Sequence, residues 1–374
     1  MKHPDWQSAR KLLCIRLDSL GDVLMCTPAI RALREGAHGR HITLLTSPSA
    51  AALAPYLGDI DASLDYAAPW VRHQQGHPRR DGGTDGERMI GTLAAQRFDA
   101  AVIFTSYSQS PLPAALLCLQ AGIPLRLAHC RENPYEVLTD WIPEPEPAAL
   151  LRHEVQRQLD LVAHVGCSPS SPRLSFRIRQ HDLDYVRGLL RLRGVDPGRP
   201  WILLHPGASA ASRRYPVSHW VKVIELLAER DAAPVVLAGS SVEQDIIEAI
   251  RRANRGSRNV ADGPKVVDLT GALNLGQLGA ALSLATVAVT NNSGPAHIAA
   301  AIGTPVLTLY ALTNPQHAPW HVKSRVLFHD VPCRFCYKSM CPEGHHACLD
   351  NIAPERVVNE LIQLKETSIL HSMR

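Results

Sequence analysis

Short apolar segments alternate with longer helical stretches through the first half of the chain. The apolar segments cover residues 12–17, 41–46, 98–104 and 124–128. Strands separated by helices are typical of a parallel sheet that is covered on both faces. This half therefore predicts a doubly wound α/β domain over residues 1–170.

The same alternation restarts at residue 200. Further strands are predicted at 201–207, 234–239, 266–269, 286–290 and 305–309, with helices at 216–230 and from Ser241. Residues 171–199 are expected to form a linker with a strand-like piece at 174–178 and a helix at 183–192. The second domain then covers 200–374, and its last helix is a candidate to pack back on the first domain. Two such halves predict two domains that face a cleft, with ligands beyond the carboxyl ends of the strands.

The composition is that of an ordinary globular protein. Of 374 residues, 45% are apolar and 20% are charged, which argues against disorder. With 39 Lys and Arg against 35 Asp and Glu, the net charge is +4, which suits an anionic ligand better than a nucleic acid. Nine cysteines, without an apolar leader at the start, favour free thiols in a reducing cytoplasm.

The two common nucleotide-binding fingerprints are absent from the sequence. No G-x-G-x-x-G follows a predicted strand, and there is no Walker A motif. The stretch 269–322 lacks Asp, Glu, Lys and Arg, but Asn, Pro and Gly residues interrupt it, so it does not predict a membrane span. A bound nucleotide must therefore be held in another way.

Gly21 and Asp22 follow the first predicted strand, at the start of a helix. Two interpretations of Asp22 are open. As a first-turn acid it would cap the helix or interact with the helix dipole. At the mouth of a cleft it would be a catalytic carboxylate.

Two polar segments in the second half are candidates for an anion site. The run 291–297, which includes Ser293, Gly294 and His297, follows a strand and opens a helix, where backbone N–H groups can bind an anion. The alternative is a plain helix cap with a core histidine. The small-residue loop after residue 206 ends in Arg213 and Arg214, which could fork onto phosphate oxygens or form a solvated basic turn.

Four cysteines near the C-terminus have the spacing C-x2-C-x4-C-x6-C: Cys333, Cys336, Cys341 and Cys348. This spacing admits a zinc knuckle, but zinc signatures commonly use two tight pairs, and the second pair here is loose. A metal, a redox pair and free thiols all stay open. We expect structural thiols without a metal.

Several of these segments together resemble glycosyltransferase family 9, the lipopolysaccharide heptosyltransferases. The resemblance rests on residues 15–24, 205–208, 213–216, 237–239 with Glu243, 290–297 and 341–348. It implies a GT-B fold in which the first domain binds the acceptor and the second binds the nucleotide sugar. It further implies inverting transfer of heptose from ADP-heptose to the lipid A–core oligosaccharide, with no cofactor.

The resemblance also implies roles for individual residues. Asp22 matches the proposed general base, and Ser19, Gly21 and Arg126 are assigned to the acceptor. The donor is assigned to eight residues, which are Ser209, Arg213, Arg214, Glu243, Asn292, Ser293, Gly294 and His297. The sequence departs from the family pattern at Asn292, where some members have Asp. This difference puts in doubt a role of residue 292 that needs a charge, but not a role in hydrogen bonding.

The implied location is the cytoplasm, with peripheral contact to the inner membrane and no nucleic-acid partner. Candidate membrane contacts are the basic residues Arg72, Arg79, Arg80, Arg88 and Arg97. Two alternatives remain at this point. One is a related transferase that uses another nucleotide sugar or acceptor, and the other is a non-catalytic nucleotide- or metal-binding module.

Overall fold

The computed structural model describes residues 5–71, 82–231, 233–256, 265–311, 315–334, 336 and 338–372. Its contacts divide the chain into two compact units, Met1–Ser175 (unit 1) and Phe176–Arg374 (unit 2). Arg72, Arg79 and Arg80, three of the five candidate membrane contacts, lie outside the described residues.

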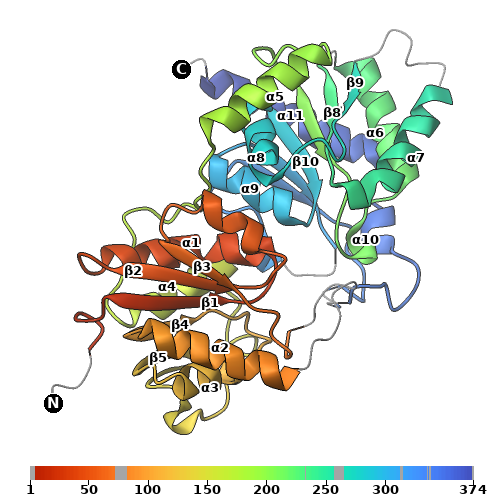
Figure 1. Cartoon of the computed structure of the whole chain (residues 1–374). Helices are drawn as coiled ribbons and strands as arrows, with labels where there is room; N and C mark the ends of the chain where they lie inside the picture. The colour runs from red at the N-terminus through yellow and green to blue at the C-terminus, as the bar shows by residue number, and fades with distance from the viewer. Residues whose placement is uncertain are drawn as a thin grey trace. The chain divides into compact units, whose positions relative to one another are not determined.

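Unit 1 is a parallel sheet of six strands in the order β3-β2-β1-β4-β5-β6. The strands are β1 (Lys11–Arg16), β2 (His41–Thr46), β3 (Ala62–Asp65), β4 (Ala100–Ile103), β5 (Leu125–Cys130) and β6 (Asp140–Pro143). The helices are α1 (Leu20–Glu35), α2 (Gly82–Gln96), α3 (Leu112–Gln120) and α4 (Glu154–Ala163). Helices α1 and α4 pack together on one face of the sheet, and α2 and α3 on the other (Figure 1).

Unit 2 repeats this architecture with the order β12-β11-β10-β7-β8-β9, all parallel. Its strands are β7 (Ile202–His205), β8 (Val235–Leu237), β9 (Val266–Asp268), β10 (Val287–Asn291), β11 (Val306–Leu309) and β12 (Ser324–Leu327). Its helices are α5 (Gln180–Leu192), α6 (Val217–Arg230), α7 (Gln244–Gly256), α8 (Leu275–Leu284), α9 (Gly294–Ile302), α10 (Ala347–Asp350) and α11 (Pro354–Ser372). Helices α5, α8 and α9 cover one face, and α6, α7 and α11 the other (Figure 1).

Both sheets have the doubly wound order in which strands run outward from the first strand in two directions. The first strand is β1 in unit 1 and β7 in unit 2. The inner strands are buried on both faces, which explains their continuous apolar runs. The prediction of two doubly wound parallel sheets is thus confirmed, and each sheet has a switch point where its strand order reverses.

The sequence pattern missed three strands, β3, β6 and β12, which are all edge strands. Each has four residues, and several of them are exposed, so the apolar signal is weak. The strand-like piece at 174–178 is not a strand. Its apolar residues Leu174 and Phe176 are buried by packing without joining a sheet.

The segment expected to be a linker contains α5, which packs against α8 of unit 2. The last helix, α11, packs against α6 and against β10, β11 and β12. Among the described residues, no helix combines the length and the apolar character that crossing a bilayer requires.

Candidate functional site

A buried arginine organises the carboxyl edge of the unit 1 sheet. Arg16, the last residue of β1, is 1% exposed and meets a carboxylate with each of its three side-chain nitrogens. Nε lies 2.8 Å from Asp18 and Nη1 lies 2.9 Å from Glu154. Nη2 lies 3.4 Å from Oδ1 of Asp22. The three acids come from the turn after β1, from α4 and from the first turn of α1.

Asp22 caps its helix, as one of the two interpretations of its position predicted. Ser19 is the N-cap of α1, with extended φ −76° and ψ 167°. Its backbone N–H and its hydroxyl donate to Oδ2 of Asp22 over 3.0 and 2.6 Å, which closes the first turn of the helix. The other oxygen, Oδ1, faces Arg16. The carboxylate is thus a helix cap that also belongs to a buried charge cluster.

Asp18 is a second carboxylate at this edge that sequence reasoning did not select. Gln109 donates from Nε2 to Oδ1 of Asp18 over 2.6 Å. Burial raises the pKa of Asp18, and the nearby Asp22 and Glu154 carboxylates add to this effect, while Arg16 opposes it. One guanidinium therefore serves three acids, and the pKa of one of them is raised.

A second charge network ties α4 to the same sheet. Arg157 of α4 is 1% exposed, pairs with Glu144 and donates to the Thr105 carbonyl. Glu146 lies 3.4 Å from Arg157. His129 Nε2 lies 3.3 Å from the Arg157 carbonyl oxygen, and burial, with the Arg157 charge second, lowers the pKa of His129 to about 4.

The residues assigned to the acceptor do not all meet at this edge. Ser19 and Gly21 lie beside Asp22 in the first turn of α1, as the sequence predicted. Arg126 is different, because it lies toward the middle of the sheet. It is the second residue of β5 and is in register with Ala101 of β4. Ala101 is in turn in register with Leu13, which lies three residues before the end of β1. The Arg126 guanidinium donates to four backbone carbonyls, those of Ile123, Pro124, Glu136 and Val137. Arg126 thus braces the polypeptide around β5, and its assignment to the acceptor stays a prediction.

In unit 2, a buried asparagine ties together the two strands at the switch point. Asn291 ends β10 and is fully buried. Its Nδ2 donates to the carbonyl of Pro206 over 2.6 Å, and its Oδ1 accepts from the backbone N–H of Tyr215 over 3.2 Å. Both ends of the loop after β7 are thereby fixed beside the start of α9.

The two arginines of this loop have different surroundings. Arg214 Nε donates to the Ala208 carbonyl over 2.8 Å, so this side chain closes the loop on itself. Arg213 Nε is buried and has no hydrogen-bond partner among the described residues. Ser209 is exposed on the same loop. The Nε of Arg213 is therefore a buried donor that is open to a ligand.

Glu243 lies against the backbone of the β7 loop. Its Oε2 accepts from the backbone N–H and the hydroxyl of Ser240, over 2.8 and 3.0 Å. A Cβ on Gly207 would lie 1.6 Å from Oε1 of Glu243, so only glycine leaves room for this carboxylate. His205 Nε2 lies 3.8 Å from Oε2, and burial lowers the pKa of His205 although Glu243 opposes this shift.

The remaining donor candidates lie at the N-terminus of α9. Ser293 is its N-cap and Gly294 its first residue. Asn292 and His297 are buried, and the Asn292 backbone N–H donates to the Leu309 carbonyl over 2.9 Å. The loops after β7, β8 and β10 therefore bring the donor candidates to one edge of the unit 2 sheet, at a helix N-terminus that suits an anion.

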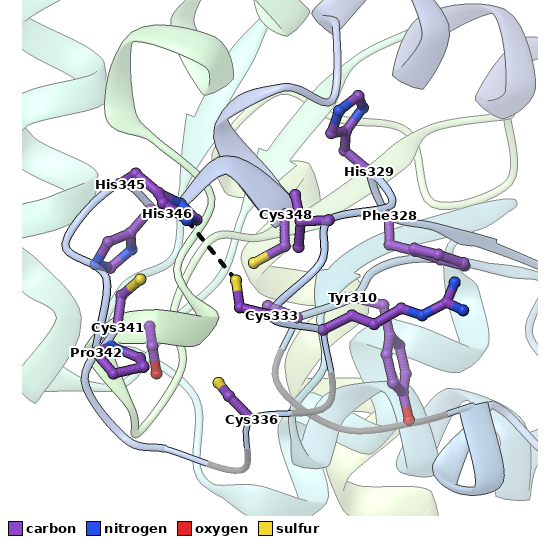
Figure 2. A pocket seen from close by; sticks show the side chains of 14 residues that line it. Tyr310, Phe328, His329, Cys333, Cys336, Cys341, Pro342, His345, His346 and Cys348 are labelled. Atoms are coloured by element: carbon purple, nitrogen blue, oxygen red, sulfur yellow. Dashed lines mark hydrogen bonds between the residues drawn. The ribbon is translucent and has the colours of Figure 1, made fainter.

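Next to the β7 loop, four cysteines are among the residues that line a pocket partly open to solvent. Figure 2 shows the side chains of Cys333, Cys336, Cys341 and Cys348 around it. All four thiols are free, and Cys333 Sγ lies 3.7 Å from Nε2 of His345. In the described part of the chain, no three His, Cys, Asp or Glu side chains are grouped so that they could hold a metal ion.

Sequence reasoning did not select Arg16 or Glu154 as site residues, and it included Asn291 only as a member of the run 291–297. An arginine at the end of an apolar strand is a signal that can be read from the sequence, because a buried charge needs a partner. Asn291 stands beside a selected residue, and only the structure shows that its amide bridges two loops. Glu154 is 138 positions away from Arg16, and no local pattern relates the two.

The chain is similar to heptosyltransferases along most of its length. The family model described as glycosyltransferase family 9 (heptosyltransferase) matches residues 87–347. Lipopolysaccharide heptosyltransferase 1 of Pseudomonas aeruginosa is 23% identical, over 94% of this chain and 97% of the relative. Lipopolysaccharide heptosyltransferase 2 of Escherichia coli K12 is 27% identical, over 73% of this chain and 78% of the relative.

A solved structure shows the same fold. It is that of the E. coli ADP-heptose lps heptosyltransferase II, which is similar with a TM-score of 0.72 at 23% identity. The match covers 96% of this chain and 99% of that one.

Proposed function

The chain belongs to glycosyltransferase family 9, and from this premise we propose that it transfers a heptose from ADP-heptose to the lipopolysaccharide inner core, with inversion at the anomeric carbon. The names of its relatives support this donor and this acceptor. The geometry supports the reaction class, because one unit carries a carboxylate cluster and the other carries an anion-binding edge.

The observation that carries the proposal is the switch point of unit 2. There the buried Nε of Arg213, without a partner among the residues described, stands on a loop that Asn291 fixes beside the start of α9. A guanidinium and a helix N-terminus stabilise the negative charge that develops on a departing nucleoside diphosphate. We assign the diphosphate of the donor to this edge.

We assign the other donor residues to the same edge of the unit 2 sheet. The polar edge formed by Ser293, Gly294 and His297 is assigned to the diphosphate and the ribose. Glu243, held by Ser240 against Gly207, is assigned to the nucleoside. Each assignment rests on position at the carboxyl edge of the parallel strands, where doubly wound sheets bind their ligands.

In unit 1 we assign the general base to Asp22. A single displacement requires that the acceptor hydroxyl loses its proton as its oxygen attacks the anomeric carbon and the bond to the diphosphate breaks. The Asp22 carboxylate is 24% exposed and sits in the first turn of α1, so it can be reached by a substrate while Ser19 fixes its orientation. The proton passes to the carboxylate, and ADP carries the leaving charge.

We also propose peripheral contact with an acidic membrane surface. The support is the set of basic residues between Arg72 and Arg97, of which Arg88 is exposed on α2. A lipid-linked acceptor is presented at such a surface, and each basic residue near it contributes about 1 kcal/mol of attraction.

The test is a transfer assay with ADP-heptose and a panel of truncated core acceptors, with and without a chelator. The expected result is formation of ADP and of one heptosylated acceptor, at a rate that the chelator leaves unchanged. Transfer from another nucleotide sugar, but not from ADP-heptose, would replace the donor in this proposal. Loss of structure with chelator would instead favour a metal-binding module built on the cysteines.

A further inference from the structure

The charge cluster of unit 1 contains an acid that the proposed reaction has not used. Glu154, the first residue of α4, is fully buried. Its Oε1 accepts from Arg16 Nη1 over 2.9 Å and from Gln158 Nε2 over 2.8 Å. Its Oε2 is buried and has no hydrogen-bond partner among the described residues. Such a carboxylate is costly to bury, and a buried ion pair is weak evidence for a stabilising role.

The distances show how the Arg16 charge is shared. Asp18 and Glu154 lie within 2.9 Å of its nitrogens, whereas Asp22 is held at 3.4 Å. Two close partners on Nε and Nη1 fix the guanidinium plane, and Nη2 is the nitrogen that remains toward Asp22. An arginine engaged by Asp22 alone would form a close, charge-assisted pair with it.

A close pair of that kind would make Asp22 a poor base. Bonding to an arginine favours the ionised form of a carboxylate and so reduces its tendency to take up a proton. General-base catalysis is most effective when the base keeps substantial proton affinity near the working pH. Because Asp18 and Glu154 occupy Nε and Nη1, the two short contacts of Arg16 go to these acids, and Asp22 keeps only the longer contact of 3.4 Å.

We propose that Glu154, together with Asp18, is a positioning residue that fixes Arg16 and limits its hold on the Asp22 carboxylate. The inference rests on the proposed function, since it takes Asp22 as the base. Glu154 acts through Arg16, from an element far away in the sequence, and it does not touch the substrate.

The charged and titratable groups around Asp22 come from four places, the fourth being α1 itself. Arg16 ends β1, Asp18 lies in the turn, and Glu154 begins α4. The Cys26 thiol of α1 donates to the Asp22 carbonyl over 3.3 Å, and burial raises the pKa of Cys26, so this thiol stays neutral. The sign of the effect follows from these groups. Removing a negative neighbour makes the ionised Asp22 more stable, so it takes up a proton only at lower pH.

The experiment is the pH dependence of kcat for transfer from ADP-heptose, with Glu154→Gln and Asp18→Asn. In both variants we expect the acid limb of the profile to move to lower pH by about 0.5–1 unit, with a lower plateau because the base is weaker. Glu146→Gln is the matched control. It removes a buried carboxylate that pairs with Arg152 and Arg157 but not with Arg16. This control variant should lower the melting temperature, and the acid limb of its pH profile should coincide with that of the wild type.

Each outcome decides a separate point. Acid limbs of Glu154→Gln and Asp18→Asn that overlay the wild-type limb would overturn the inference. If Glu154→Gln does not fold, Asp18→Asn, whose side chain is 18% exposed, gives the same readout. Abolished transfer in Asp18→Asn would make Asp18 the base and overturn the inference as well. Near-normal transfer by Asp22→Asn would defeat the proposed function itself, whatever the limbs show.

Discussion

At the scale of single residues, two adjacent arginines illustrate how hydrogen bonds that are already made decide which group is left for a ligand. Arg214 uses its Nε on the Ala208 carbonyl, whereas the Nε of Arg213 is buried without a partner among the described residues. A donor that is removed from water and left unpaired costs free energy, and a bound phosphate would recover it.

We therefore predict that Arg213→Ala and Arg214→Ala differ in their effects. Losing a charge-assisted hydrogen bond costs roughly 1.5–3 kcal/mol, so Arg213→Ala should weaken ADP binding by about one to two orders of magnitude. Arg214→Ala should mainly lower the melting temperature, because it releases the loop. Calorimetric titration with ADP measures the first effect. Unchanged affinity in Arg213→Ala would remove its assignment to the diphosphate.

The residue scale also shows where sequence motifs stop being sufficient. The motif around Asp22 predicted a carboxylate at the start of a helix, and the structure places it there, with Ser19 as its cap partner. The same reasoning assigned Arg126 to the acceptor, although its guanidinium binds backbone carbonyls of its own neighbourhood. Sequence reveals that an arginine needs partners, but the fold decides which partners it finds.

At the scale of elements, α4 is attached to unit 1 by buried charged residues as well as by buried apolar ones. Arg157 pairs with Glu144, and the Arg157 charge lowers the pKa of Glu144 although burial opposes this. His129 on β5 contacts the Arg157 carbonyl, and burial lowers the pKa of His129 to about 4 from 6.5. The histidine is thus neutral in the folded protein at neutral pH.

This arrangement predicts a pH-dependent stability. Because the pKa of His129 is lower in the folded than in the unfolded chain, the unfolded chain binds a proton first as the pH falls from about 6.5 toward 4. His129 should therefore reduce stability by up to about 1.4 kcal/mol per pH unit in this window. The pKa of Glu144 is lowered from its ordinary value of 4.5, so the stability that this ionised carboxylate contributes is lost below about that pH. Most of the window in which His129 titrates lies above it.

Denaturant unfolding of the wild type and of His129→Gln between pH 7 and pH 5 measures this contribution. The variant should lose less stability than the wild type over that range. Equal losses in the two proteins would show that His129 does not titrate in this way.

Predicting elements from sequence succeeded where burial is complete. The inner strands β1, β7 and β10 are buried on both faces, and their continuous apolar runs indicated them. The edge strands β3, β6 and β12 are short and partly exposed, so they give no comparable signal. The candidate site residues follow the inner strands, so their positions along the backbone could be predicted from the sequence. The contact between Arg16 and Glu154 could not, because 138 positions separate the two residues.

At the scale of the whole molecule, one topology occurs twice with different chemistry. In each unit the polar residues gather after the first strand, β1 or β7, on the side where parallel strands end. Unit 1 offers carboxylates around one buried arginine, and unit 2 offers a cationic loop and a helix start. This difference supports the proposed division between an acceptor unit and a donor unit.

The proposed membrane contact leads to a prediction about the whole chain. Binding to vesicles of anionic lipid should fall steeply with salt, because it rests on basic residues rather than on inserted apolar groups. The double change Arg79→Gln and Arg80→Gln should weaken it, while Arg199→Gln with Arg252→Gln, at exposed positions of unit 2, should not. Sedimentation with anionic vesicles at increasing salt concentration measures the bound fraction of the wild type and of each double variant. Retention at high salt would indicate insertion of apolar groups instead.

The central claim is that Asp22 is the general base of a heptosyl transfer and not only a helix cap. Asn retains an oxygen that can accept from Ser19, so a pure cap should tolerate Asp22→Asn with little loss of stability or rate. Asn cannot take the acceptor proton, so loss of a base should lower turnover by about 10²–10⁴-fold.

The most direct measurement is the transfer rate of Asp22→Asn from ADP-heptose, with ADP affinity and melting temperature determined on the same preparation. We predict that turnover falls by about 10²–10⁴-fold while ADP affinity and melting temperature stay close to those of the wild type. A well-folded Asp22→Asn protein that transfers heptose at a near-normal rate would contradict this account.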